Sequence, residues 1–282
     1  MNPRFSPGLG VSQAITAAMG CGLDRLDAQL LVLHVLGKNP HDRAWLLAHD
    51  TDPMDADALQ RLDTLVQRRQ TGEPLAYLTG HKAFFGLDLA VDARVLDPRP
   101  DTETLVEWAL EVLSDAPAAS VMDLGTGSGA VALALKATRP DLQVSALDYS
   151  DDALAVARLN ALQLGLDVTL QQGAWLVGVQ GKFNAIVSNP PYIAAQDEHL
   201  AALTHEPLQA LASGSDGLDD IRQIIGQAPA HLLPGGWLLL EHGYDQSLAV
   251  RALLVEAGFT HVQSRQDLSG IARCSGGCIN PA

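Results

Sequence analysis

Asp-Leu-Gly-Thr-Gly-Ser-Gly, DLGTGSG, occupies residues 123–129 and begins inside an apolar run at 120–124 that predicts a buried strand. The Ala- and Leu-rich residues 130–137 then predict a helix, which Pro140 ends. Glycines between a strand and a helix let the backbone approach a ligand near the helix N-terminus. In a parallel sheet such a ligand binds at the carboxyl edge of the strands.

Strand and helix patterns alternate along the chain beyond residue 118. Further strands are predicted at 143–148, 168–171, 183–188 and 237–241, and helices at 152–164, 221–233 and 247–257, with a turn at 234–236. The last two segments, 260–265 and 271–279, are predicted to pair as a terminal antiparallel hairpin. This alternation predicts an α/β fold with a doubly wound, mostly parallel sheet covered by helices on both faces.

Residues 1–75 have a helical pattern instead. One helix is predicted from Asp24 to Gly37, and a second from Asp52 as N-cap, with Pro53 in its first turn, to a stop at Gly72. These helices predict a small bundle, either a packing subdomain or a surface that recognises a partner. Residues 81–96 show strand-like alternation, which predicts a hairpin, so we assign 76–100 as a β-hairpin linker and 101–282 as the third segment.

The charge and the cysteines limit the classes of function. The formal charge is −15, with 33 acidic and 18 basic residues, which disfavours a general nucleic-acid binder. Cys21, Cys274 and Cys278 lack the paired spacing of a zinc or redox motif, so we expect no metal site and a reduced, cytoplasmic setting. We expect no signal peptide, because the apolar stretch 11–21 contains Gln13 and Thr16 and only Arg4 precedes it as a basic residue. We expect no membrane span, because no apolar run approaches the required ~18 residues.

The glycine loop and the next strand predict an adenosine-type cofactor. Asp148 ends that strand, where its carboxylate can accept hydrogen bonds from both ribose hydroxyls. Dinucleotide sites space their glycines as GxGxxG to admit a pyrophosphate, whereas Gly125, Gly127 and Gly129 follow a GxGxG pattern after Asp123. S-adenosylmethionine has a sulfonium cation and no phosphate, so the spacing and the acidic residue favour it.

A second motif, Ser-Asn-Pro-Pro-Tyr at 188–192, ends the predicted strand 183–188 at the same sheet edge. The Asn189 side-chain oxygen and the Pro190 carbonyl can each accept one N–H of a planar NH2 group, and Tyr192 can stack on that group. Both acceptors would oppose positive charge on nitrogen during methyl transfer. The alternative is a rigid loop with an Asn turn and a buried Tyr.

DLGTGSG together with SNPPY is similar to the amino-methylating class I methyltransferases. The flanking motifs GEPLAYLTG at 72–80, PRPDTE at 98–103, HEPLQAL at 205–211 and LLLEHG at 238–243 resemble the peptide chain release factor glutamine methyltransferases, the PrmC/HemK family. This resemblance covers nearly the whole chain. It implies a class I methyltransferase fold and N5-methylation of the glutamine in the Gly-Gly-Gln loop of class I release factors.

The resemblance also implies that S-adenosylmethionine is converted to S-adenosylhomocysteine. We expect a cytoplasmic monomer that contacts no nucleic acid directly. Residues 1–75 would be the substrate-recognition domain and 101–282 the methyltransferase domain. Implied cofactor-binding residues are Gly125, Thr126, Gly127, Ser128, Gly129, Asp148, Trp175 and Asn189. Implied substrate-binding residues are Asn189, Pro190, Pro191 and Tyr192, of which Asn189, Pro190 and Tyr192 would be catalytic.

Two positions depart from the family pattern. Ala174 stands where an acidic residue commonly precedes the tryptophan, which leaves the adenine contact open, and Asp97 replaces a residue that is usually apolar. We also expect a structural ion pair between Arg99 and Glu103. His242 is expected to be a satisfied strand-end histidine, and Cys274 and Cys278 to be packed thiols.

Two other functions fit parts of the pattern. An exocyclic amine of adenine or guanine suits the same Asn-Pro-Pro-Tyr geometry, so a DNA or RNA amino-methyltransferase is the nearest alternative, although the charge of −15 argues against it. The other alternative is a protein that binds S-adenosylmethionine without catalysis, or an adaptor associated with translation. Asn189 and Pro190 argue against that role.

Overall fold

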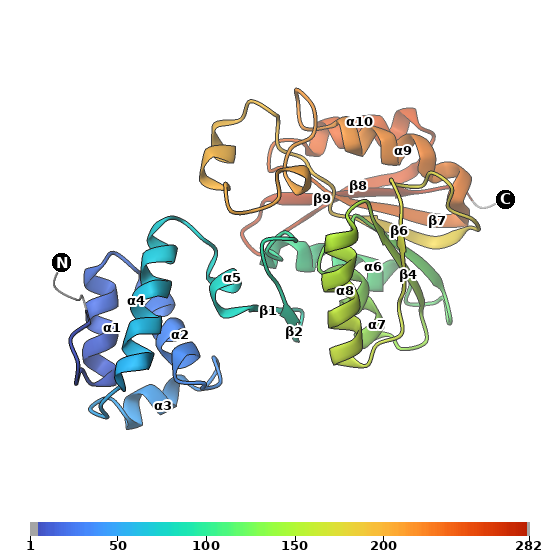
Figure 1. The fold of residues 1–282 in the computed structure, drawn as a ribbon. Coiled ribbons are helices and arrows are strands. Elements are labelled where there is room, and N and C mark those ends of the chain that lie inside the picture. The colour runs from blue at the N-terminus through green and yellow to red at the C-terminus, as the bar shows by residue number, and fades with distance from the viewer. Residues whose placement is uncertain (1–4, 281–282) are drawn as a thin grey trace. The chain divides into compact units, whose positions relative to one another are not determined.

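A computed structural model describes residues 5–280, in which the chain forms two compact units divided between Gly80 and His81. The first unit holds five helices: α1 Val11–Gly20, α2 Arg25–Val35, α3 Arg43–Ala48, α4 Ala56–Gln70 and α5 Leu75–Thr79 (Figure 1). It has a hydrophobic core of its own, to which α1, α2 and α4 contribute fully buried residues such as Ala14, Leu31 and Leu62. The first predicted helix is confirmed, since the Asp24 side chain accepts the Asp27 N–H at its N-cap.

The predicted start of the second helix at Asp52 and Pro53 is wrong. The helix α4 begins at Ala56, and its N-cap is Asp55, whose side chain accepts the Ala58 N–H at 2.6 Å. Pro53 instead forms an isolated antiparallel bridge with Gly10. Pairing with a distant part of the chain therefore delays the helix by one turn.

The second unit begins with an antiparallel hairpin, β1 His81–Phe84 and β2 Leu87–Ala90, as the alternating pattern predicts. Its main sheet has seven strands in the order β5-β4-β3-β6-β7-β9-β8. The strands are β3 Ser120–Leu124, β4 Gln143–Asp148, β5 Thr169–Gln172, β6 Phe183–Ser188, β7 Leu232–Glu241, β8 Thr260–Gln266 and β9 Ala272–Cys278. Among the described strands of this sheet, β9 runs antiparallel to both of its neighbours, β7 and β8, and all other neighbouring strands are parallel. The predicted terminal hairpin, formed by β8 and β9, is therefore confirmed.

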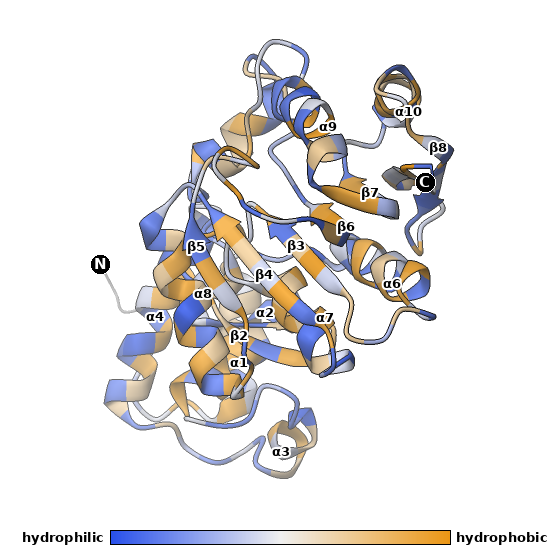
Figure 2. Ribbon diagram, turned by 90° about the vertical axis from the view of Figure 1, so that its right-hand side faces the viewer, coloured by the Kyte–Doolittle hydropathy of each residue, from blue (hydrophilic) through white to orange (hydrophobic). Residues whose placement is uncertain are grey.

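Helices cover both faces of this sheet. α6 Glu103–Val112, α7 Ala130–Thr138 and α8 Asp151–Leu164 lie on one face, and α9 Asp219–His231 and α10 Ser247–Glu256 on the other (Figure 1). Both faces of the central strands are therefore buried, and Figure 2 shows apolar residues within β4 and β7. The chain also forms short 3-10 turns, η1 Pro100–Thr102, η2 Glu198–Ala202 and η3 Leu208–Ala210. This is the class I methyltransferase fold.

The prediction for residues 232–236 is wrong. They belong to β7, where we predicted a helix end and a turn. The register between β6 and β7 shifts at this point, and Gly235 has a φ of 78°, so the predicted turn is an irregularity inside the strand. A β-carbon on Gly236 would lie 2.8 Å from the Leu233 carbonyl oxygen, which explains why the chain needs glycine there.

None of the helices within residues 5–280 combines the length and the apolar character needed to cross a membrane.

Candidate active site

A cavity of about 330 Å³ opens at the carboxyl edge of the main sheet, where the neighbouring strands β4, β3 and β6 end. The strand order reverses at β3, which is where open α/β sheets bind ligands. Of the residues predicted for the site, those lining the cavity are Gly125, Thr126, Gly127, Ser128, Asp148, Trp175, Asn189 and Pro191. Gly129, Pro190 and Tyr192 lie in the same loops, outside its wall.

The glycine loop is shaped by its backbone and by Asp123. Gly125, Gly127 and Gly129 have φ values of 70°, 56° and 86°, which L-residues with side chains rarely adopt. The Asp123 carboxylate accepts hydrogen bonds from the Thr126 hydroxyl at 2.6 Å and the Ala132 N–H at 3.2 Å. Burial raises the pKa of Asp123 to about 7 against these bonds, so this carboxyl titrates near neutral pH.

Asp148 reaches the cavity from the end of β4. Its two oxygens accept the backbone N–H groups of Gly127 and Ser150, each at 2.9 Å. These bonds orient the carboxylate, and each oxygen keeps lone-pair capacity for a further donor. Burial raises the pKa of Asp148, while the backbone donors lower it. The group can therefore receive the two hydroxyls of a ribose.

Trp175 forms another part of the cavity wall. It has a positive φ of 50°, and a β-carbon on Gly125 would lie 3.4 Å from its ring, so the indole sits against the glycine loop. The indole N–H donates to the Asp220 carboxylate at 3.1 Å. Ala174 also lines the cavity and brings no carboxylate, whereas Asp220 does. Nothing in the sequence pattern singled out Asp220, because it lies 45 residues farther along the chain, at the start of α9.

The Asn-Pro-Pro-Tyr loop follows β6. The Asn189 side-chain nitrogen donates to the Thr102 hydroxyl oxygen at 3.3 Å, which directs that end of the amide toward η1. Tyr192 is held at both ends: its carbonyl accepts from Gln246 Nε2 at 2.9 Å, and its hydroxyl donates to Glu241 Oε1 at 3.4 Å. Burial beside Glu241 raises the pKa of the Tyr192 hydroxyl, so it stays protonated.

Glu241 is a buried acid that the sequence reasoning missed as a site residue. It ends β7 and is 1% exposed. Burial raises its pKa to about 7, while the hydroxyls of Thr102 and Tyr192, which face it, lower that pKa. The motif LLLEHG at 238–243 contains this acid at the end of an apolar strand, next to His242, and that position could have identified it.

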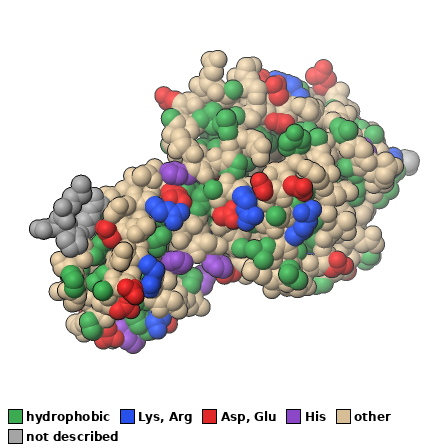
Figure 3. All heavy atoms as spheres, in the orientation of Figure 1, with side chains coloured by type: hydrophobic (Ala, Val, Ile, Leu, Met, Phe, Trp, Pro, Cys, Tyr) green, Lys and Arg blue, Asp and Glu red, His purple; other side chains and the backbone are tan. Residues whose placement is uncertain are grey.

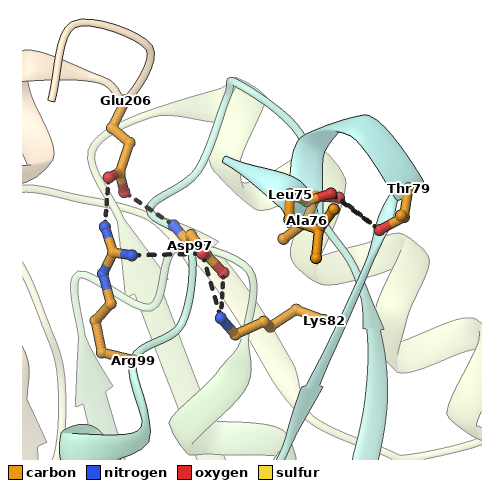
Figure 4. Close-up of polar contacts among 7 residues, drawn as sticks. All are labelled: Leu75, Ala76, Thr79, Lys82, Asp97, Arg99 and Glu206. Carbon is orange, nitrogen blue, oxygen red and sulfur yellow. Dashed lines mark hydrogen bonds and ion pairs between the residues drawn. The ribbon is translucent and has the colours of Figure 1, made fainter. Parts of the chain in front are cut away.

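The predicted ion pair between Arg99 and Glu103 is wrong. Arg99 pairs with Glu206 and with Asp97, as Figure 4 shows. Glu103 instead accepts the backbone N–H of Phe85 at 2.9 Å, because α6 begins beside the turn of the β1–β2 hairpin. Arg99 therefore pairs with a neighbour, Asp97, and with the distant Glu206, while Glu103 meets the hairpin turn.

Asp97, the departure noted in the sequence, is the centre of a four-residue network. Its carboxylate pairs with Lys82 at 3.0 Å, and its backbone N–H donates to Glu206 at 3.2 Å (Figure 4). The side chain of Glu206 is only 2% exposed. This network ties β1 and the segment before η1 to the loop between η2 and η3. That loop supplies Pro207 to the cavity wall, and η3 supplies Gln209 and Ala210. In the first unit, Figure 4 also shows Thr79 donating to the Leu75 carbonyl of its own helix at 3.1 Å.

The expectations for His242 and the thiols are confirmed. His242 is fully buried, and its ring nitrogens lie 2.8 Å from the Gly243 carbonyl and 2.7 Å from the Ser275 hydroxyl. Cys274 and Cys278 are buried and free. These residues pack in the sheet and take no part in the cavity wall.

Comparison with known proteins covers both units. Residues 12–80 match the family model of the PrmC N-terminal domain, and residues 102–264 match that of the methyltransferase small domain. The chain is 50% identical, over 92% of its length and 96% of the relative's, to a release factor glutamine methyltransferase of Bordetella pertussis (strain Tohama I). It is 48% identical to a protein of the same name from Xylella fastidiosa (strain Temecula1), over 93% of this chain and 98% of that one.

A solved methyltransferase structure from Pyrococcus furiosus shares the fold. It aligns with a TM-score of 0.53 at 20% identity, covering 77% of this chain and 99% of that one.

Proposed function

The chain belongs to the family of release factor glutamine methyltransferases, and from this premise we propose that the cavity at the carboxyl edge of its main sheet is the active site. The protein is an enzyme that methylates a glutamine side chain of a release factor. The finer assignment is transfer to the N5 atom of the glutamine in the Gly-Gly-Gln loop of class I release factors. The observation that carries it is that Asn189 and Asp148 lie in the wall of one cavity with the glycine loop.

We assign S-adenosylmethionine as the methyl donor, because the chemistry of the cavity wall fits it. The ionisable side chains that line the cavity include three carboxylates, Asp123, Asp148 and Asp220, and one guanidinium, Arg94. Such a wall suits a sulfonium cation and ribose hydroxyls better than a pyrophosphate. When bound, this cofactor supplies a methyl group activated by positively charged sulfur. The assignment gives the ribose to Asp148 and the adenine side to Trp175.

Asn189 and Pro190 would hold the glutamine amide. The Asn189 side-chain oxygen accepts one N–H and the Pro190 carbonyl the other, which fixes the nitrogen in the plane required for in-line attack. Both oxygens oppose the positive charge that develops on that nitrogen as it gains the methyl group. The nitrogen then loses one proton to water, so no side chain has to act as general base. Pro191 and Tyr192 keep the loop rigid around these acceptors.

We assign recognition of the release factor to the helical segment 1–75. The partner is a protein of the translation machinery, so we place the enzyme in the cytoplasm. We further propose that it acts as a monomer. On the face shown in Figure 3, Lys and Arg side chains largely lie beside Asp or Glu. Ion pairs such as Arg94–Asp92 and Arg68–Glu73 likewise join basic side chains to acidic ones. That arrangement gives no support to the nucleic-acid alternative.

The assignment is tested with methyl-labelled S-adenosylmethionine and a recombinant class I release factor. We expect label on the release factor and none when the loop glutamine is changed to alanine. The Asn189→Ala enzyme should lose at least ~100-fold in kcat, because one of the two acceptors is gone. Label that persists on the alanine release factor, or that enters DNA or RNA alone, would overturn the assignment.

A further inference from the structure

We propose that Glu241 is a positioning residue for methyl transfer, a buried carboxylate that sets the orientation of the Asn189 amide through the Thr102 hydroxyl and anchors Tyr192 directly. The proposal rests on the proposed function, since it concerns how the same site is held. It brings together three segments, η1, the Asn-Pro-Pro-Tyr loop and the end of β7. None of Thr102, Glu241 or the relay between them is needed by the steps described above.

The sheet places Glu241 next to the reacting loop. Ser188, the last residue of β6, pairs in register with Leu240 of β7. The residues that follow this pair are Asn189, directly after β6, and Glu241, the last residue of β7, so they lie side by side at the carboxyl edge of the sheet. A carboxyl that is only 1% exposed at this position is costly to bury unless donors meet it.

The donors that meet it come from the catalytic loop and from η1. Tyr192 donates its hydroxyl hydrogen to Oε1 at 3.4 Å. The Thr102 hydroxyl faces the same carboxylate and lowers its pKa. Within residues 5–280, Oε2 is a buried oxygen with no hydrogen-bond partner, so it is the acceptor that remains available to the Thr102 hydrogen.

The direction of the relay follows from the single hydrogen of a hydroxyl group. When Thr102 directs its hydrogen toward Glu241, its oxygen is left to accept, and Asn189 Nδ2 donates to it at 3.3 Å. The Asn189 side-chain oxygen, at the other end of the amide, then points away from Thr102. It can accept the hydrogen bond that a substrate N–H donates. Without the carboxylate, Thr102 could donate to the Asn189 oxygen instead, and the amide would present N–H groups to the substrate N–H.

The charge on Glu241 matters for the same reason. A protonated Glu241 can donate to Thr102 and reverse the relay, so transfer requires the ionised form. Four charged or titratable groups interact with Glu241. They are Asp101 in η1, Tyr192 in the Asn-Pro-Pro-Tyr loop, and Arg273 and Cys274 on β9. Since the pKa of Glu241 is about 7 in this setting, kcat should rise as the pH passes through that value.

The test compares Thr102→Val, Thr102→Ser and Glu241→Gln in the full-length enzyme with a recombinant release factor as substrate. We expect Thr102→Val to lower kcat by ~10- to 100-fold, with the affinity for S-adenosylhomocysteine, measured by calorimetry, within about 2-fold of wild type. Thr102→Ser should recover most of kcat because it restores the hydroxyl. Glu241→Gln should lower kcat similarly and abolish the rise near pH 7.

The control is Thr138→Val on α7, which removes a hydroxyl bonded to the Ala134 carbonyl outside the cavity. Circular dichroism and thermal unfolding establish that each variant is folded. Unchanged kcat in Thr102→Val, equal losses in the valine and serine variants, or a Glu241→Gln profile that keeps the step would each overturn the proposal. If the wild-type enzyme itself leaves the release factor glutamine unmethylated, the proposed function fails instead.

Discussion

The carboxylate of Asp148 receives one backbone N–H on each oxygen, from Gly127 and Ser150. These donors belong to the turns after β3 and β4, so the side chain is already oriented before a ligand arrives. Preorganisation of this kind lowers the cost of ordering on binding. A single substitution at this position therefore tests the cofactor assignment without touching the Asn-Pro-Pro-Tyr loop.

Asp148→Ala should weaken binding of S-adenosylhomocysteine by ~10- to 100-fold or more, because each hydrogen bond to a charged acceptor is worth about 1.5–3 kcal/mol. Isothermal titration calorimetry measures the loss. Asp167→Ala is the matched control, because Asp167 is an exposed acid outside the cavity wall. Equal affinities for the two variants would show that Asp148 does not hold the ribose.

Gly129 shows the limits on a single backbone position. It has a φ of 86°, and an added β-carbon would lie 2.9 Å from Leu133 Cδ1. We expect Gly129→Ala to destabilise the protein by about 1–2 kcal/mol. Gly226→Ala is the opposite control: it lies inside α9, an added β-carbon meets nothing within 4 Å, and it should stabilise by about 0.5–1 kcal/mol. Chemical denaturation measures both, and a Gly129→Ala variant as stable as wild type would contradict the steric argument.

At the scale of elements, the loop between η2 and η3 depends on one buried carboxylate. Glu206 accepts from Arg99 and from the backbone N–H of Asp97. The exposed fraction of its side chain is 2%, against 49% for Asp216, which also pairs with an arginine. Solvent screens the exposed Asp216 carboxylate far more than the buried Glu206 carboxylate, so the two pairs should differ in how much they stabilise the fold.

Glu206→Gln should loosen this loop, because it removes the charge that Arg99 and the Asp97 N–H meet. We expect faster limited proteolysis within residues 194–212 and weaker binding of S-adenosylhomocysteine, since the loop carries Pro207 to the cavity wall. Asp216→Asn should leave both measurements near the wild-type values. Proteolysis that proceeds equally in the two variants would show that the Glu206 network does not anchor the loop.

The central strands could be predicted from the sequence because the local pattern of apolar residues is enough to specify each strand. β3 and β6 are short apolar runs that end at a glycine and a proline segment, respectively, and the predicted bounds of β3, β4 and β6 agree with the structure. Where contact with a distant part of the chain sets the bounds of an element, the prediction from the sequence was wrong. Gly10 bridges Pro53 and delays α4, and the shifted register with β6 keeps residues 232–236 in β7.

The same distinction applies to the candidate site. Asp148 and Asn189 follow directly from the rule that carboxyl ends of neighbouring parallel strands meet at one edge. Asn189 and Thr102 are 87 residues apart in the chain, and Trp175 and Asp220 are 45 apart, so no local pattern joins them. The side chains that orient the site are fixed by packing of the whole unit.

For the whole molecule, Asp123 and Glu241 are two of the acids whose raised pKa values contribute to the pH dependence of stability. Asp123 and Glu241 are buried, and burial raises the pKa of each to about 7. An acid with a higher pKa in the folded state binds its proton more tightly there than in the unfolded chain. Its contribution to stability is therefore complete below its ordinary pKa near 4 and is lost as the pH rises through about 7.

Asp123→Asn removes one of these titrations while retaining a side-chain acceptor for Thr126 and Ala132. We expect the difference in Tm, variant minus wild type, to increase steadily between pH 5 and pH 8, because only the wild type loses stability through this group. About 1.4 kcal/mol accompanies each tenfold change in proton affinity, and about 1 kcal/mol moves the Tm by ~2–4 °C at this size, so the change should reach several degrees. Measuring both proteins by circular dichroism in the same cofactor-free buffers cancels the other titrating groups. A difference that stays flat or falls over this range would mean that Asp123 is not protonated preferentially in the folded state.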